Sequence, residues 1–194
     1  MICFCNIRYL CKKNMHTSRS SEINLVTQAF VTEFGSLGKD ALNWSPDANT
    51  WSIARNIDHL IVINSTYFPV FDAIKDGSHK PPFMSKLGFW VNWMGSFILK
   101  SVQPDRKKKI RTVAVWEPRT GDIDEGILGQ FAGHQDKLYQ YINELDGAQT
   151  VISSPASNFI VYTLDKALDI IIAHEKRHLE QAREVARLLK SVHP

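Results

Sequence analysis

The chain has 194 residues, a net charge of +3 and 44% hydrophobic residues. This length favours one domain with a substantial core. The net charge is too small to indicate that the protein binds nucleic acid. All three cysteines, Cys3, Cys5 and Cys11, lie near the N-terminus, so the rest of the chain cannot build a disulfide framework. That usage is typical of a reducing compartment, and we expect a soluble, cytoplasmic protein.

The N-terminal segment, residues 1–19, lacks the order of a secretory signal, because its basic residues follow the short apolar stretch. We expect a poorly structured tail here, with Met15 as an alternative start, and one domain over 20–194. The most apolar internal run, "LGFWVNWMGSFIL", has 13 residues. A membrane-spanning helix needs roughly 20 residues, so this run is too short to be one.

Four segments place apolar residues at helical spacing. They cover residues 22–38, about 50–71, 127–145 and about 164–191. Ser20 or Ser21 is a candidate cap for the first helix, and Asn49 or Thr50 for the second. Pro69 is expected to kink or end the second helix.

Between the second and third segments, residues 76–122 lose this regular spacing, and Pro and Gly recur. Within them, 84–100 has the pattern of one helix, and "TVAVWEP" at 112–118 is a candidate extended piece. No stretch alternates with period two for long enough to require a sheet. The pattern predicts an all-α protein, a four-helix bundle with a long crossover between helices 2 and 3.

The fourth segment contains "HEKRH" at 174–178, the His-Glu-x-x-His zinc signature of many metalloproteases. Residues four apart share one side of a helix, so His174 and His178 can direct their imidazoles at one ion. The apolar stripe passes through this pair, and buried imidazoles need partners. A peptidase is disfavoured, because Gln181 and Glu184 stand where the longer signature requires Gly and His.

A third ligand must come from earlier in the chain. His59, in "TWSIARNIDHL", lies among inward-facing apolar residues of the second segment, where the alternative is a hydrogen-bonded core histidine. Together, "TWSIARNIDHL" and "HEKRHLEQ" resemble the DinB/YfiT-like family of helical bundle proteins, over roughly residues 20–190. The resemblance implies a four-helix bundle with a divalent metal held by three histidines, which correspond to His59, His174 and His178.

Three neutral imidazoles leave a divalent ion at least one open position, which is typical of a catalytic site. Such a site activates water or a thiol, and the resemblance implies S-transferases that use low-molecular-weight thiols, or hydrolases. We expect a metal-dependent enzyme with a small-molecule substrate, and thiol transfer is favoured. Zinc or nickel is the expected metal, and iron also suits histidine ligands. The alternative is a non-catalytic metal-binding or stress-response module.

Two residues beside the histidine pair are candidates for supporting roles. Glu175 is the candidate catalytic residue, as a general base; the alternative is a surface pair with Lys176 or Arg183. Gln181 lies one turn after His178 and is a candidate partner that orients its ring. Its alternative is a solvated helix residue.

His134 lies on the inner stripe of the third helix and is a candidate fourth ligand or proton donor, or a core histidine.

Three aromatic residues of the crossover are candidates for a pocket wall, for packing onto the bundle or for a dimer face: Phe89, Trp90 and Trp93. The basic run "DRKKKIR" at 105–111 would attract an anionic thiol or a membrane surface, or form a solvated loop. We expect neither nucleic acid nor a membrane as partner, and a homodimer fits exposed aromatics. A third hypothesis is a bundle attached to a membrane through "FWVNWMGSFIL".

Overall fold

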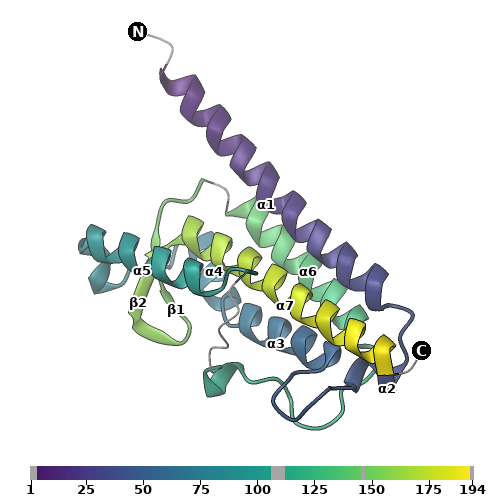
Figure 1. Ribbon diagram of the computed structural model, residues 1–194. Coiled ribbons are helices and arrows are strands. Elements are labelled where there is room, and N and C mark those ends of the chain that lie inside the picture. The colour runs from purple at the N-terminus through teal and green to yellow at the C-terminus, as the bar shows by residue number, and fades with distance from the viewer. Residues whose placement is uncertain (1–3, 106–111, 146, 193–194) are drawn as a thin grey trace.

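The structure is a computed structural model that describes residues 4–105, 112–145 and 147–192, with side chains from residue 19 onward. The elements are α1 (Phe4–Phe34), α2 (Lys39–Asn43), α3 (Ile53–Ser65), α4 (Phe68–Lys75), η1 (Phe83–Lys86), α5 (Gly88–Ser101), η2 (Ala114–Trp116), α6 (Ile127–Glu144), β1 (Val151–Ser154), β2 (Ser157–Thr163) and α7 (Leu164–Val192) (Figure 1). The mostly helical fold agrees with the sequence. The division into a tail at 1–19 and a domain at 20–194 stays a prediction.

Four long helices, α1, α3, α6 and α7, pack side by side. Helix α1 lies against α6 and α7, and α3 lies against the same two helices (Figure 1). The helices expected at 127–145 and 164–191 are confirmed as α6 and α7. Neither Ser20 nor Ser21 is a cap, because α1 continues through both. The hydroxyl of Ser20 instead donates to Asn143 of α6, at 3.2 Å.

The second expected helix is divided into α3 and α4. Ser52, rather than Asn49 or Thr50, caps α3, because its hydroxyl accepts a backbone N–H of the first turn. Pro69 lies in the first turn of α4, where a missing N–H costs no helical hydrogen bond. The expected interruption near Pro69 is therefore present: α3 ends at Ser65, and Pro69 lies at the start of the next helix.

A β-hairpin stands before α7, and it corrects the expectation that the chain has no sheet. Strands β1 and β2 pair antiparallel, with Val151 opposite Thr163. The longer strand, β2, has the sequence SNFIVYT and a burial pattern that does not alternate, so it lacks the period-two signal of a half-buried strand. The expected extended piece at 112–118 is also wrong in part, since Ala114–Trp116 form a 3₁₀ turn. The helix expected at 84–100 is present as α5.

Two apolar clusters fill the interior. One gathers around α4, the later part of α6, the hairpin and the start of α7. The other gathers around α2, α3, the start of α6 and the later part of α7.

Buried polar residues occur where the helices pass from one cluster to the other: Asn64 on α3, Gln135 on α6, and Glu175, Arg177 and His178 on α7. Burying such groups is costly unless they are bonded. This polar layer therefore marks the place to look for a site. Among the described residues, no helix has the length and apolar character that crossing a bilayer requires.

Candidate metal centre

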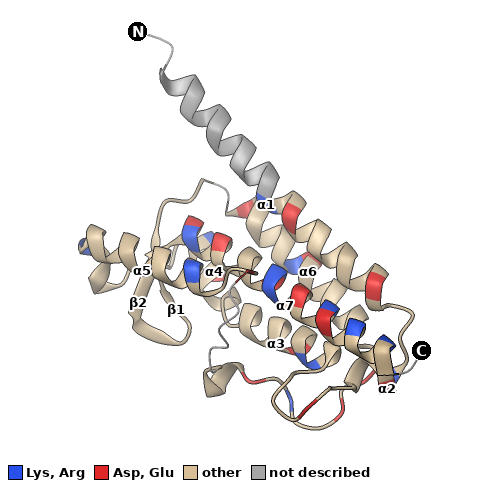
Figure 2. Ribbon diagram, viewed as in Figure 1, with Lys and Arg blue, Asp and Glu red and all other residues tan. Residues whose placement is uncertain are grey.

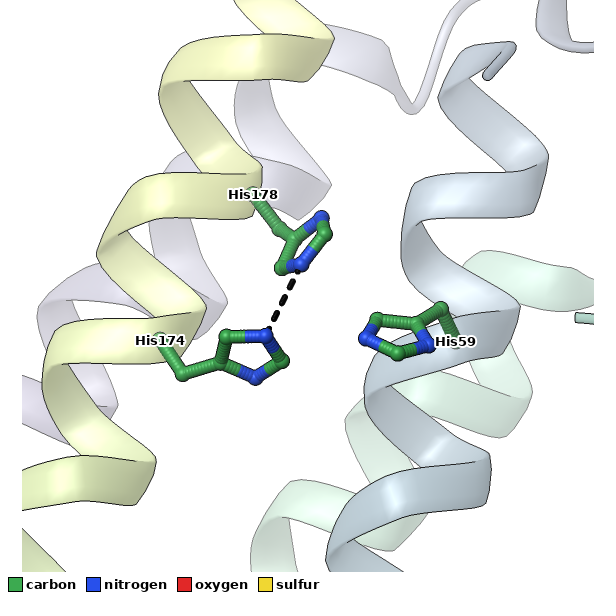
Figure 3. A group of neighbouring side chains, drawn as sticks. All are labelled: His59, His174 and His178. Atoms are coloured by element: carbon green, nitrogen blue, oxygen red, sulfur yellow. Dashed lines mark hydrogen bonds between the residues drawn. The ribbon is translucent and has the colours of Figure 1, made fainter. Parts of the chain in front are cut away.

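His59, His174 and His178 meet between α3 and α7, with their rings directed into the space between the two helices (Figure 3). One nitrogen of each ring lies within 4.8 Å of one nitrogen of the other two. The Nε2 atoms of His174 and His178 are 3.0 Å apart. The structure thus brings together all three histidines that the sequence indicates.

The orientation of His59 is set by a loop that follows α5. Its Nδ1 lies 2.6 Å from the carbonyl oxygen of Trp116, and since a carbonyl only accepts, Nδ1–H donates and Nε2 keeps a lone pair. The loop is itself held to α3. Asp58 accepts from the backbone N–H and Nε of Arg119, at 2.7 and 2.8 Å, and the Trp116 indole donates to Thr66.

The orientation of His178 is set by Asn56 of α3. The Oδ1 atom of Asn56 lies 2.7 Å from Nδ1 of His178, and its Nδ2 donates to the carbonyl oxygens of Ser52 and Trp51. With the amide oriented in this way, Nδ1–H of His178 donates and Nε2 keeps the lone pair. Asn56 therefore makes the contact that the sequence led us to expect of Gln181.

Burial lowers the pKa of all three imidazoles. The pKa of His174 falls to about 3, mainly by burial and further by the charges of His59 and Arg177. Burial also places the pKa of His178 well below its ordinary value, and it lowers that of His59 against the opposing hydrogen bond to Trp116. All three rings are therefore neutral near pH 7, the form that binds a metal ion.

The donor set fits a divalent ion. Two lone pairs 3.0 Å apart repel, so the contact between His174 and His178 needs a proton or a cation between the nitrogens. A Zn–N bond of about 2.0–2.1 Å keeps two ligand nitrogens within about 4.2 Å of each other. A pair at the 4.8 Å limit would close by about half an ångström, which small side-chain rotations can supply. Zinc, nickel and iron all accept imidazole nitrogen.

The comparison with protein families points the same way as this geometry. A family model described as the DinB superfamily matches residues 22–182, a range that includes all three histidines. The chain belongs to the DinB superfamily. The comparison with curated proteins and the comparison with solved structures each found no match. Family membership therefore confirms the resemblance carried by "TWSIARNIDHL" and "HEKRHLEQ".

In this DinB-superfamily protein Glu175 is fully buried. Its two carboxyl oxygens accept hydrogen bonds from the amides of Asn64 and Gln135, each at 2.7 Å. Burial raises the pKa of Glu175 to about 8, and the two amide hydrogen bonds oppose that rise. The alternative of a surface pair with Lys176 or Arg183 is wrong, because this side of α7 faces the interior. A catalytic role for Glu175 stays a prediction.

His134 does not belong to the cluster of metal-ligating side chains found among the described residues. Its ring stacks on Phe68, with centroids 5.0 Å apart. Neither ring nitrogen makes a hydrogen bond of acceptable geometry within the described part of the chain. Burial lowers the pKa of His134 to about 4, offset in part by the side chain of Gln135. His134 is thus a half-buried residue that packs on Phe68, outside the histidine cluster.

Trp51 is the aromatic residue that covers the histidines. Its ring centroid lies 4.8 Å from that of His59 and 5.9 Å from that of His178, nearly parallel to the latter ring. The candidate wall residues Trp90 and Trp93 instead contact each other, at 5.1 Å. They lie on α5, which packs on β2 and α7. Most of the basic run at 105–111 lies outside the described residues.

Three neighbours of the cluster, Trp51, Asn56 and Trp116, have no predicted role from sequence. Trp51 and Asn56 do lie within "TWSIARNIDHL", and the helical period places Asn56 near the inner side of α3. Trp116 acts through its backbone carbonyl, which every residue carries. Sequence offers no signal for that contact.

Proposed function

We propose that this protein is a metal-dependent enzyme in which His59, His174 and His178 hold a divalent ion within a four-helix bundle. Zinc and nickel are the preferred ions, and the reaction is the activation of a thiol or of water toward a small-molecule substrate. The supporting observation is pre-orientation. The Nδ1 atoms of His59 and His178 are engaged by Trp116 and Asn56, which leaves the Nε2 lone pair of each ring available to a metal ion.

When bound, a divalent ion in such a site makes a coordinated thiol or water lose its proton more readily. The residues of the chain supply the remaining requirements. Three neutral imidazoles leave part of the coordination shell open to a substrate, and Trp51 shields one side of the rings from water. Glu175 is our candidate for moving a proton, acting from the buried polar layer. We favour thiol transfer over hydrolysis on the resemblance to S-transferases.

The first experiment measures bound metal per chain by elemental mass spectrometry, on protein purified without a metal-affinity tag. We expect close to one equivalent in the wild type and its loss in His59→Ala and His174→Ala. His134→Ala is the matched control, since it removes a half-buried histidine outside the cluster, and it should keep its metal. If the wild type binds no metal after zinc or nickel is supplied, the proposal of a three-histidine metal site is wrong.

A second measurement separates an enzyme from a metal-binding module. The loaded protein is mixed with low-molecular-weight thiols and electrophilic acceptors, and separately with ester and amide substrates. Turnover by the wild type that is lost in His174→Ala supports the enzyme. Bound metal with no turnover, and with four protein ligands by X-ray absorption spectroscopy, would favour the non-catalytic module instead.

A further inference from the structure

Large aromatic side chains are exposed on the part of the molecule formed by η1, α5 and the β-hairpin. We call this group the aromatic surface; it consists of Phe83, Phe89, Trp93, Phe97 and Phe159. Each of these side chains is between 54% and 80% exposed. Isolated exposed apolar residues are ordinary, but a contiguous group marks an interaction site.

The elements that carry the aromatic surface, η1, α5 and β2, pack against one another. Phe89, Trp93 and Phe97 are spaced four apart on α5, which places them on one side of that helix. The rings of Trp93 and Phe97 stack at 5.7 Å. Trp90 bridges to the hairpin, with its ring 5.1 Å from that of Trp93 and its indole nitrogen 3.5 Å from the carbonyl oxygen of Phe159.

The inner side of α5 is attached to the body of the protein, which keeps the aromatic side turned outward. Val91 and Gly95 are the buried residues of α5. A Cβ atom at Gly95 would lie 2.8 Å from Cγ of Lys166 and 3.0 Å from Cβ of Tyr162. A larger residue at this position would have to displace the side chain of Lys166, so glycine favours the close approach to α7 and β2. The helix therefore lies flat on the protein rather than projecting from it.

The two segments that carry the aromatic surface contain charges of one sign, and Asp76 and Asp105 flank the first of them. Residues 77–104 contain Lys80, Lys86 and Lys100 and no Asp or Glu, and residues 147–164 contain no charged residue. In Figure 2 the hairpin shows neither the blue of Lys and Arg nor the red of Asp and Glu, and α5 shows no red. All three lysines are exposed. Lys86 ends η1, two residues before α5 begins, and Lys100 lies in the last turn of α5, so positive charge stands at both ends of the aromatic row.

We propose that the aromatic surface docks onto an anionic lipid surface. A row of Phe and Trp bordered by lysine is the composition that inserts at the level of lipid headgroups, with lysines near anionic phosphates. Helix α5 has 14 residues, so it binds in the plane of the interface and does not cross the bilayer. The acidic residues that follow the hairpin, Asp165 and Asp169, do not oppose this docking, because their two carboxylates are ion-paired with the two cations Arg19 and Lys166.

A second copy of the chain fits this surface less well. In a two-fold symmetric dimer each patch meets an identical patch. Lys86 and Lys100 would then approach the same lysines of the partner, with no carboxylate in 77–104 or 147–164 to pair with them. Like charges placed together in an interface disfavour it. An anionic membrane satisfies both the aromatic side chains and the lysines.

The test is flotation of the full chain with vesicles of phosphatidylcholine, or of phosphatidylcholine and phosphatidylserine in equal parts. We expect flotation with the anionic vesicles, weakened by added salt. The double variant Trp93→Ser/Phe97→Ser should bind about tenfold more weakly, and Lys86→Glu/Lys100→Glu should lose the preference for anionic lipid. The matched controls, Leu25→Ser and Lys190→Glu, change an exposed apolar residue and an exposed lysine elsewhere and should bind like the wild type.

A second readout does not depend on truncated aromatics. Lipids with brominated acyl chains should quench part of the tryptophan fluorescence, and Trp93→Phe should still float while showing less quenching. Two results would overturn the proposal. One is a wild type that stays with neither kind of vesicle. The other combines two observations: the wild type does not bind anionic vesicles, and light scattering shows a dimer that Trp93→Ser/Phe97→Ser abolishes. The partner of the aromatic surface would then be a second copy of the chain.

Discussion

The side chain of Asn56 on α3 reaches across to α7, where its Oδ1 lies 2.7 Å from Nδ1 of His178. The amide is held in this orientation because its nitrogen donates to the carbonyl oxygen of Ser52, at 2.9 Å. The residue that caps α3 thus lies next to the residue that orients a candidate metal ligand. This contact joins the two helices that supply the three histidines.

We expect Asn56→Ala to lower the affinity for zinc or nickel by about 10- to 100-fold, the usual cost of removing a hydrogen bond to a ligand histidine. Without the amide, the His178 ring can rotate and exchange its tautomer. The measurement is a competition titration with a chromophoric chelator. Asn24→Ala, at an exposed position of α1, is the control. Equal affinities for the two variants would show that Asn56 does not orient His178.

A second prediction concerns the ion pair between Asp58 and Arg119, which holds the loop whose Trp116 carbonyl orients His59. The carboxylate of Asp58 is buried, whereas the side chain of Arg119 is largely exposed. Asp58→Ala should lower the free energy of unfolding by about 1–3 kcal/mol, because it leaves a backbone N–H without its acceptor, and it should also weaken metal binding.

Arg119→Ala is the matched control for Asp58→Ala. The backbone N–H of residue 119 still donates to Asp58 in this variant, so the loop stays in place and both effects should be smaller. Urea unfolding and the chelator competition measure the two quantities. An Arg119→Ala defect as large as that of Asp58→Ala would mean that the exposed guanidinium, and not the buried carboxylate, holds the loop.

A third prediction uses the raised pKa of Glu175, about 8 in the folded protein against an ordinary value of 4.5. Between these values the folded protein keeps a proton that the unfolded chain has released. The free energy of unfolding contributed by this group is therefore fully present below pH 4.5 and is lost as pH rises toward 8. The loss is at most about 1.4 kcal/mol per pH unit.

The experiment compares urea unfolding of metal-free wild type and Glu175→Gln between pH 5 and pH 8. The wild type should lose stability relative to the variant as pH rises. The histidines with lowered pKa values act in the opposite direction below about pH 6.5, but they are common to both proteins and cancel in the difference. Gln135 can turn its amide toward the new amide in Glu175→Gln, because its Oε1 makes no hydrogen bond of acceptable geometry among the described residues. Parallel pH curves would contradict the raised pKa.

A fourth prediction concerns His134, a half-buried residue stacked on Phe68, whose buried ring nitrogens make no hydrogen bond of acceptable geometry to a described residue. His134→Leu should raise the free energy of unfolding by about 1 kcal/mol near pH 7, since an unpaired polar group is removed from the interior. The gain should be larger at acid pH, where unfolding lets the imidazole take up a proton. Thermal and urea unfolding check this. A less stable variant would indicate that His134 has a partner in solution.

The long helices and the histidine set follow from local patterns in the sequence. Apolar residues at three- and four-residue spacing locate α6 and α7 almost to their ends, because burial of one side of a helix imposes that period. The same period places His174 and His178 on one side of α7. The family resemblance adds His59, and the structure brings all three together.

Only the tertiary structure decided which groups surround that set. The partner of His178 comes from Asn56, 122 positions away, and His59 is oriented by a backbone carbonyl. Glu175 looks like a surface residue between Lys176 and Arg177, yet it is bound by amides from α3 and α6. Short-range spacing reports which side of a helix a residue occupies. Which group on a neighbouring helix contacts that residue depends on how distant segments pack. No single stretch of the chain contains that information.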